Sequence, residues 1–417
     1  MNGNEKKLLV PRLRFPEYRA EDGWGSEFGN MIFDQISNKD HNSDLPVLAI
    51  TQEQGAIPRE MIDYHVSVTD KSLESYKVVE VGDFIISLRS FQGGIEFSRY
   101  RGICSPAYVI LRLRHGHSED YFRHYLKTDR FIAQMIKNLE GLRDGKMISY
   151  KQFSELELPI PPRDEQQKIA DCLSSLDDLI AAETYKLDTL KTHKKGLMQQ
   201  LFPREGETVP RLRFPEFRDD DVWESDLLGN IFDTTSGGTP SRSTKEYWDG
   251  YIPWITTSLV NFGIITHADE FISEAGLKNS AAKLFPRGTV LIAMYGQGKT
   301  RGQVALLGIE AATNQACAAI LPRKEIDPNF VFLNLASRYD EIRQLSNSGG
   351  QENLSQGLIR ELSFSYPLNP AEQQKITACL TSVDNVINAQ VQKIETLISN
   401  KNGLTQQLFP FLGEVSS

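Results

Sequence analysis

The chain has 417 residues, of which 40% are hydrophobic and 24% are charged, a composition typical of a folded globular protein with about two to four domains. No apolar run approaches the roughly 18 residues of a membrane span, and the first residues lack the apolar core of a signal peptide. We therefore expect a cytoplasmic protein that does not contact membranes. The net charge of −9 does not exclude DNA as a partner, because binding depends on local patches of charge.

The opening segment, Val10 to Trp24, returns as Val209 to Trp223 with 11 of 15 residues identical. Each copy precedes a region of short apolar runs separated by turn residues. In the first region we predict strands at Val78–Leu88 and Ser105–Arg114, followed by a helix at Glu119–Leu139.

Ser105 to Tyr108 (SPAY) is similar to the tetrapeptide of adenine methyltransferases, with Ala107 in place of the second proline. No glycine-rich cofactor loop precedes it, so we interpret it as part of a core strand. His115 and His117 lack nearby cysteines or suitably spaced carboxylates, and the four cysteines have no metal-binding spacing, so we predict no metal site.

A second repeat ends each half of the chain. Glu165 to Pro203 matches Glu372 to Pro410 at 22 of 39 positions. Alternating steps of four and three residues predict a coiled-coil seam in both copies, interrupted by polar residues at the same two steps, Glu183/Gln390 and Lys194/Lys401. The apolar seam residues are Ile169, Leu173, Leu176, Ile180, Leu187, Leu190, Leu197 and Leu201 in the first copy and Ile376, Leu380, Val383, Ile387, Ile394, Leu397, Leu404 and Leu408 in the second.

A long helix packed on an ordinary core would explain the apolar stripe of each copy but not the matched polar steps. We interpret those steps as devices that fix the register or as contacts to another subunit. Gly196 and Gly403 lie inside the two copies. They indicate a bend, a close backbone approach or a frayed last turn.

The second region repeats the order of the first, with a strand at Thr289–Tyr295, a loop, further strands and a helical segment at Asn329–Leu345. Ala293 to Thr300 loosely fits a phosphate-binding loop. The residues after it predict a strand rather than the helix that such a loop requires, so we interpret it as a basic turn.

The turn-rich loops of both regions are rich in residues that read bases or bind phosphates. For each one alone, a solvated side chain or a local turn hydrogen bond is the competing explanation. Asn314 and Gln315 adjoin an apolar strand and can equally be core amides. The DNA-binding candidates are Arg89, Ser90, Gln92, Arg99 and Arg101 in the first region and Ser241, Arg242, Ser243, Thr256, Thr257, Gln297, Lys299 and Arg301 in the second.

We find no catalytic constellation: no nucleophilic triad and no cluster of nuclease carboxylates. With the repeats in view, the chain resembles the DNA-specificity subunit of type I restriction–modification systems. The motifs that carry the resemblance are LPIPPRDEQQKIADCL and YPLNPAEQQKITACL, each with its heptads and QQLFP ending, together with SGGTPSRSTKEYWDGYIPWITTS and GTVLIAMYGQGKTRGQV. The first region lacks the GGTPSR opening, so contacts in one half should not be copied to the other.

The resemblance implies an α+β chain with an internal pseudo-two-fold repeat: two α/β target-recognition domains joined by two long helices that form an antiparallel coiled coil. The predicted boundaries are 1–159 and 204–366 for the recognition domains, 160–203 and 367–410 for the spacer helices, and 411–417 for a tail. Each recognition domain would read one half of a split, asymmetric target in double-stranded DNA, and the helices would set the gap between the halves.

The resemblance also implies that the chain is non-catalytic and binds no cofactor itself. Two methyltransferase subunits that bind S-adenosylmethionine would dock on it, as would two restriction subunits that use ATP and Mg²⁺ in complexes that contain them. Two alternatives remain open: an orphan or inhibitory specificity protein that acts as a DNA-binding adaptor, and a self-sufficient adenine methyltransferase.

Overall fold

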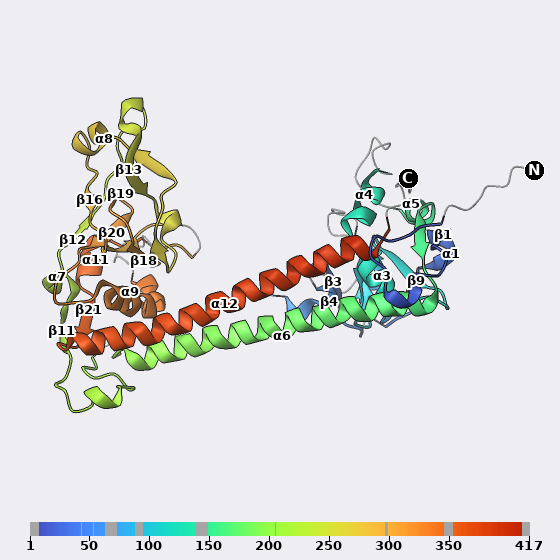
Figure 1. The fold of residues 1–417 in the computed structure, drawn as a ribbon, viewed down its shortest axis with the longest axis horizontal. Helices are drawn as coiled ribbons and strands as arrows, with labels where there is room; N and C mark the ends of the chain where they lie inside the picture. Colours follow the sequence, from blue (N-terminus) through green and yellow to red (C-terminus); the bar gives the residue numbers. More distant parts are fainter. Residues whose placement is uncertain are drawn as a thin grey trace, which may run out of the picture. The chain divides into compact units, whose positions relative to one another are not determined.

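The computed structural model describes residues 8–42, 44–52, 54–62, 73–87, 95–137, 149–204, 206–296, 299–345 and 353–410. The chain divides into two compact units (Figure 1). Unit 1 comprises residues 1–184 and 392–417, and unit 2 comprises residues 185–391. Each unit contains a region of strands and short helices together with parts of both long helices. Among the described residues, every helix is too short or too polar to cross a membrane.

The two predicted long helices are present as α6 (Arg163–Leu201) and α12 (Pro370–Leu408), each 39 residues long. Both end two residues before a proline, in line with the bias of the residue before proline against helical backbone. The division between the units falls inside both helices.

In unit 1, α6 and α12 run antiparallel, because Asp177 pairs with Lys401 whereas Glu183, further along α6, pairs with the earlier Lys393. In unit 2, Lys194 pairs with Asp384 at 2.6 Å. Three of the four polar seam positions therefore form ion pairs between the helices, and all the apolar seam positions are buried or half-buried. A Cβ atom added to Gly196 or Gly403 would meet nothing within 4 Å, so the close backbone approach considered at these glycines is wrong.

Unit 1 is built on a four-stranded sheet in the order β2-β9-β6-β7, with two separate strand pairs, β3-β4 and β5-β8. The strands are β2 (Phe33–Ile36), β3 (Leu48–Thr51), β4 (Gly55–Pro58), β5 (Lys77–Val79), β6 (Phe84–Ile86), β7 (Glu96–Phe97), β8 (Gly102–Cys104) and β9 (Val109–Leu113).

Three predictions for unit 1 need correction. The strand predicted at Val78–Leu88 is two strands, β5 and β6, separated by a turn in which Gly82 has a φ of 95°. SPAY is not a core strand but a turn, closed by a 3.1 Å hydrogen bond from the Tyr108 N–H to the Ser105 carbonyl. The helix predicted at Glu119–Leu139 is α3 (Glu119–Tyr125) and α4 (Asp129–Lys137), because the Thr128 hydroxyl accepts from the Phe131 N–H and starts a new helix.

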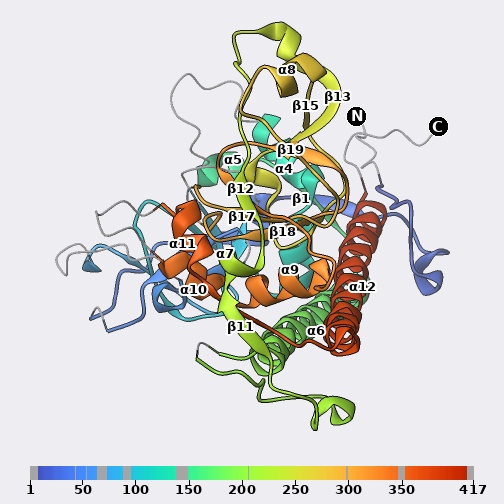
Figure 2. The same cartoon turned by 90° about the vertical axis from the view of Figure 1, so that its left-hand side faces the viewer.

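Unit 2 contains a five-stranded sheet, β12-β20-β17-β18-β14, and a second sheet, β15-β13-β19-β16. The helical segment predicted there is split into α9 and α10, and α9 packs on β17 and β18 between the first sheet and α12 (Figures 1 and 2). The elements are β12 (Thr234–Ser236), β13 (Trp248–Ile255), β14 (Ile264–Ile265), β15 (Glu270–Ile272), α8 (Glu274–Lys278), β16 (Leu284–Phe285), β17 (Val290–Ala293), β18 (Val304–Leu307), β19 (Ala311–Thr313), β20 (Cys317–Ile320), α9 (Pro328–Ser337) and α10 (Tyr339–Gln344).

The same small motif joins the sheet region of each unit to its long helices. In both units a two-stranded antiparallel pair lies beside two short helices in contact with each other. In unit 1 these are β1 (Gly25–Phe28), β10 (Glu157–Ile160), α1 (Gly29–Ile32) and α5 (Tyr150–Ser154); in unit 2 they are β11 (Glu224–Leu227), β21 (Ser363–Tyr366), α7 (Leu228–Ile231) and α11 (Gln356–Arg360).

The main core of each unit takes side chains from the start of one long helix and the end of the other. In unit 1, Ile169 and Leu173 of α6 share a core with Leu408 of α12. In unit 2, Leu380 of α12 shares a core with Leu201 of α6. The buried ends of the helices thus complete the cores of the two units.

Candidate nucleic-acid interface

The repeated sequence motifs hold each unit together through an arginine clamp. In unit 1 the Arg14 guanidinium donates two 2.8 Å hydrogen bonds to the Glu165 carboxylate, and in unit 2 Arg213 does the same to Glu372. Both pairs are buried. The hydrogen bonds raise the pKa of each arginine further above its ordinary value, so the charge is permanent. The PRLRFPE and EQQK motifs recur because they are the two sides of this clamp.

The clamps differ in one contact. Trp223 Nε1 in unit 2 donates to Glu372 at 3.2 Å, whereas Nε1 of the equivalent Trp24 is buried with no hydrogen-bond partner among the described residues. The buried Glu165 carboxylate therefore depends more heavily on Arg14 for its hydrogen bonds than the Glu372 carboxylate depends on Arg213.

The glutamine that follows each clamp glutamate holds the start of a shorter helix in the same unit. Gln166 Oε1 accepts from the Ser118 N–H, at the residue before α3, and Gln373 Oε1 accepts from the Asp327 N–H, at the residue before α9. The opening segments also hold the far helix ends, because the Leu13 N–H donates to the Gln407 carbonyl and the Leu212 N–H donates to the Gln200 carbonyl.

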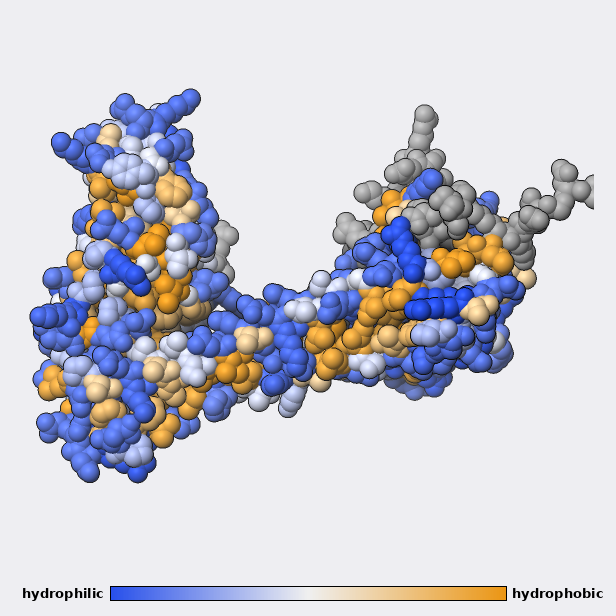
Figure 3. All heavy atoms as spheres, in the orientation of Figure 1, coloured by the Kyte–Doolittle hydropathy of each residue, from blue (hydrophilic) through white to orange (hydrophobic). Residues whose placement is uncertain are grey.

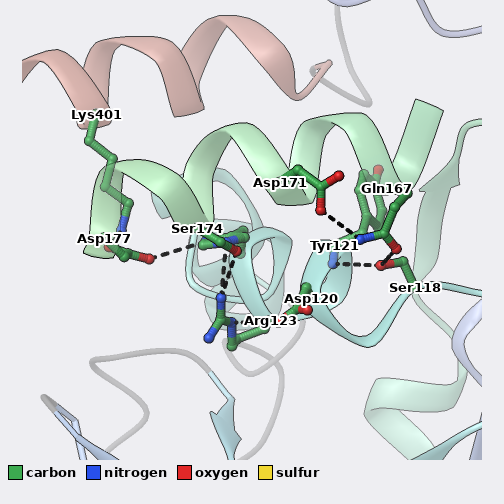
Figure 4. Close-up of polar contacts among 10 residues, drawn as sticks. Ser118, Asp120, Tyr121, Arg123, Gln167, Asp171, Ser174, Asp177 and Lys401 are labelled. Carbon is green, nitrogen blue, oxygen red and sulfur yellow. Dashed lines mark hydrogen bonds and ion pairs between the residues drawn. The ribbon is translucent and has the colours of Figure 1, made fainter. Parts of the chain in front are cut away.

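In unit 1 the polar side of α3 lies along α6 (Figure 4). Arg123 donates to the Ser174 hydroxyl at 2.9 Å, and Ser118 donates to Gln167 at 3.2 Å. Burial, followed by the neighbouring Arg123 charge, lowers the pKa of His124 to about 3, so its ring is neutral and shares a hydrogen bond with Ser174. These contacts fix the sheet region on the long helix.

A polar hollow lies beside this contact in unit 1, lined by Gln54, Glu96, Arg99, Lys127 and Lys401 among others. Glu96 is 3% exposed and pairs with Lys127, while its Oε2 atom has no partner among the described residues. Burial outweighs the Lys127 charge and raises the pKa of Glu96 to about 7.

The DNA-binding candidates of unit 1 are only partly placed. Arg89, Ser90 and Gln92 lie outside the described residues. Arg99 is exposed at the hollow and makes no hydrogen bond or ion pair with another described residue, whereas Arg101 pairs with Glu80 at 3.2 Å. Arg99 is therefore the better placed of the two for a phosphate.

Arg242 in unit 2 is held by its neighbours. Its guanidinium lies 3.7 Å from the ring centre of Trp248 and 5.0 Å from that of Trp254, and it pairs with the Glu270 carboxylate. An arginine stacked on aromatic rings and paired with a carboxylate is fixed in one orientation, with much of its charge compensated.

The loop between β17 and β18 carries two further candidates, Lys299 and Arg301; Gln297 in the same loop lies outside the described residues. The Lys299 side chain is exposed, and its carbonyl accepts a 2.6 Å hydrogen bond from the Tyr339 hydroxyl. Arg301 is half-buried and donates to the Arg343 carbonyl at 3.2 Å. The loop is thus supported from α10 by both contacts.

The hydroxyl candidates of unit 2 make local turn contacts. Ser241 and Ser243 share a hydrogen bond of 2.8 Å, Thr256 and Ser258 share one of 2.6 Å, and Thr257 begins a short 3₁₀ helix. Asn314 accepts from the Ala316 N–H, and Gln315 accepts from the Thr239 hydroxyl.

The basic residues of each sheet region do not form single patches. In unit 1, Arg112 and Arg114 pair with Asp83 and Asp34. In unit 2, Val290 lies opposite Ile320 and Ala293 opposite Cys317. Arg323 therefore follows β20 at one end of the sheet, while Lys299 lies beyond the other end. Of these two ends of the sheet, the one at which β17 leads into β18 carries the predicted contact loop.

A cluster beside that loop was not predicted from the sequence: Asn261, Phe262, Gln303, Tyr339 and Arg343. Phe262 packs edge-on against Tyr339 at 5.0 Å between ring centres, and Gln303 donates to the Asn261 side chain at 3.1 Å. The available signal was the Asn-Phe-Gly sequence, a turn with an unusually apolar centre.

The loop that loosely fits a phosphate-binding pattern leads into the strand β18, as predicted. No group of three or more potential metal-ligating His, Cys, Asp or Glu side chains occurs among the described residues.

The sequence profile of the type I restriction modification DNA specificity domain matches residues 29–192 and again 221–398. The chain belongs to this family. Two of its members in Methanocaldococcus jannaschii are the specificity subunits of the type I restriction enzymes MjaVIII and MjaIX. The first is 26% identical, with 80% of each chain covered, and the second is 28% identical, with 44% of each covered. The EcoR124I/EcoR124II specificity subunit of Escherichia coli is 26% identical over 59% of this chain and 60% of its own. The chain thus spans about half the length of the MjaIX and EcoR124I subunits in these matches.

Solved structures share the fold. A structure described as the basis of complex assembly and conformational transition of the type I R-M system superposes with a TM-score of 0.62 at 15% identity, covering 94% of this chain and 98% of the other. The S subunit of a type I restriction-modification system from M. genitalium gives a TM-score of 0.53 at 17% identity, covering 96% and 99%. The mixed helix-and-sheet architecture with two specificity domains is therefore that of the family.

Proposed function

We propose that the chain is the non-catalytic specificity subunit of a type I restriction–modification complex and that each unit reads one half of a bipartite DNA target. The observation that carries the proposal is that one duplicated frame, with its arginine clamp and strand pair, supports two different sheet regions. A frame that is kept while the displayed surfaces diverge suits two readers of an asymmetric sequence.

In this proposal Lys299 and Arg301 of unit 2 and Arg99 of unit 1 contact the DNA. Exposed or loop-borne cations at the end of a sheet suit contacts to phosphates and base edges. Arg242 and Arg101 instead support their loops, because each already pairs with a carboxylate.

The two long helices act as an antiparallel coiled-coil spacer. Each has 39 residues and a length of about 58 Å, enough to hold two readers about one turn of DNA, roughly 34 Å, apart. The large hydrophobic residues exposed on α6 and α12 include Leu179, Val386 and Ile398. Apolar side chains reach the surface along the visible face of these helices (Figure 3). This face docks two methyltransferase subunits, which bring S-adenosylmethionine, while ATP and Mg²⁺ belong to restriction subunits.

The test is a methylation map. The chain is co-expressed with a type I methyltransferase subunit from the same genome in a host that lacks DNA methylation, and N6-methyladenine is sequenced. We expect a two-part motif with a fixed unread gap that disappears without this chain. A stable complex that methylates nothing would point to an inhibitory protein, and methylation by the chain alone would point to a self-sufficient methyltransferase.

A further inference from the structure

Phe262 has a backbone conformation that an aromatic residue rarely adopts. Among the described residues, Asp249 and Phe262 are the non-glycine residues with positive φ, at 57° and 52°. Aspartate tolerates this region because its short polar side chain bonds locally, whereas a bulky residue there is strained. Strain of this kind persists only where the surroundings hold it, and it concentrates at functional sites.

The surroundings of Phe262 hold it firmly. Its N–H donates to the Val304 carbonyl at 2.8 Å, and the carbonyl of Gly263 accepts from the Leu306 N–H at 3.0 Å. The Phe262 turn is therefore fixed to β18, the strand that follows the basic loop.

The strained backbone presents the Phe262 ring at the surface. The ring is supported on one side by the edge-on contact with Tyr339, yet the residue remains 39% exposed. Tyr339 is itself fixed, because its hydroxyl donates to the Lys299 carbonyl and accepts from Arg343 at 2.7 Å. A rigid and partly exposed ring meets little entropic cost when it stacks on a flat partner.

The groups around the ring suit nucleic acid. Lys299 and Arg301 supply positive charge, and the bonded amides of Asn261 and Gln303 are of the type that pairs with adenine. An exposed apolar ring beside a loop that carries cations and amides is the composition of the wedges that enter between base pairs and kink a duplex.

We infer that Phe262 is a base-stacking wedge: on binding, its ring enters one base step of the half-site read by unit 2 and unstacks it. This inference rests on the proposed function, since it requires unit 2 to bind DNA. It adds a residue that selects sequence through the deformability of a base step rather than through hydrogen bonds.

The experiment uses the complex of the full chain with its methyltransferase subunit and duplexes that carry 2-aminopurine at successive positions of the mapped half-site. Unstacking raises 2-aminopurine fluorescence. We expect a rise at one step with the natural chain, its loss in Phe262→Asn, and its retention in Phe262→Trp. Affinity should fall about ten- to a hundredfold in Phe262→Asn, the range for losing one stacked base.

Asparagine and glycine both accept positive φ, so Phe262→Asn and Phe262→Gly should fold with an unchanged or higher melting temperature. The matched control is Phe271→Asn, because Phe271 is also 39% exposed but lies in a regular strand. This control should leave fluorescence and affinity unchanged.

A natural complex that binds its target while no step unstacks would overturn the wedge and leave the proposed function standing. The wedge is equally overturned if Phe262→Asn and Phe262→Gly fold and keep the full fluorescence rise. Failure of the natural complex to bind any DNA would instead refute the proposed function.

Discussion

Unit 1 and unit 2 share a frame but differ in what the frame displays. The strand orders β2-β9-β6-β7 and β12-β20-β17-β18 occupy corresponding places in the chain. Each sheet is preceded by one strand of the strand pair and a short helix, and is followed by the second strand of the pair and a long helix. Unit 2 adds β14 to this sheet and builds a second four-stranded sheet, where unit 1 has two separate strand pairs. The repeated residues therefore hold the frame, while the regions that diverge form the displayed surface.

Breaking the clamps should disturb the shared frame most strongly. Arg14→Ala leaves the Glu165 carboxylate buried without its partner and should cost about 3–5 kcal/mol of unfolding free energy. Arg213→Ala should cost less, because Trp223 still donates to Glu372. Denaturant unfolding, monitored by hydrogen exchange in each unit, measures the loss of stability in both variants. Equal losses in the two variants would mean that the tryptophan contact contributes nothing.

The stability of unit 1 should depend on pH through Glu96, a residue that unit 2 does not contain. Because the folded pKa of Glu96 is raised to about 7 from an ordinary 4.5, the folded state holds its proton more tightly. The stability of unit 1 should be fullest below about pH 4.5 and fall as pH rises towards 7, by on the order of 3 kcal/mol at about 1.4 kcal/mol per pKa unit.

Glu96→Gln removes that titration, so the pH dependence of exchange at the amides of β6 and β7 should flatten over the same window. Glu80→Gln, at a half-buried carboxylate in the same unit, is the control. An identical decline in Glu96→Gln and the natural chain would assign the pH dependence to another group.

A smaller effect, on the salt dependence of DNA affinity, should distinguish a residue of unit 2 that contacts DNA from one that supports a loop. Lys299→Ala should reduce the slope of log affinity against log salt by about one, because one phosphate contact is lost. Arg242→Ala should leave that slope unchanged, because its charge is already paired with Glu270, and should instead loosen the loop that stacks on Trp248. Filter binding over a salt series measures the slopes, and a reversed order would exchange the two roles.

The frame could be predicted from the sequence better than the site, for a physical reason. Heptad spacing and repeat identity depend on local periodicity, so α6 and α12 were predicted to within a few residues at each end. The clamp residues are 151 positions apart in unit 1 and 159 positions apart in unit 2. Local spacing in the sequence therefore does not predict that Arg14 and Glu165 are in contact.

Site residues were harder still, because exposure and pairing decide their roles. Arg242 and Lys299 are equally basic in the sequence, yet the first is held by aromatic rings and Glu270 while the second is exposed. Phe262 gave no polar signal at all, since its importance lies in its backbone angle. Local charge in the sequence is also a poor guide to exposed positive charge, because Asp83 and Asp34 compensate Arg112 and Arg114 far along the chain.

In the proposed arrangement, two readers held apart by a helical spacer should respond to a longer spacer in one way, which a methylation map can detect. Four residues are inserted after Thr184 in α6 and after Lys393 in α12, beside the ion pair of Glu183 and Lys393, which lengthens the spacer by about 6 Å, or roughly two base pairs. We predict N6-methyladenine in a motif whose half-sites are unchanged and whose gap is longer. An altered half-site, or an unchanged gap in an active complex, would contradict the spacer role of the helices.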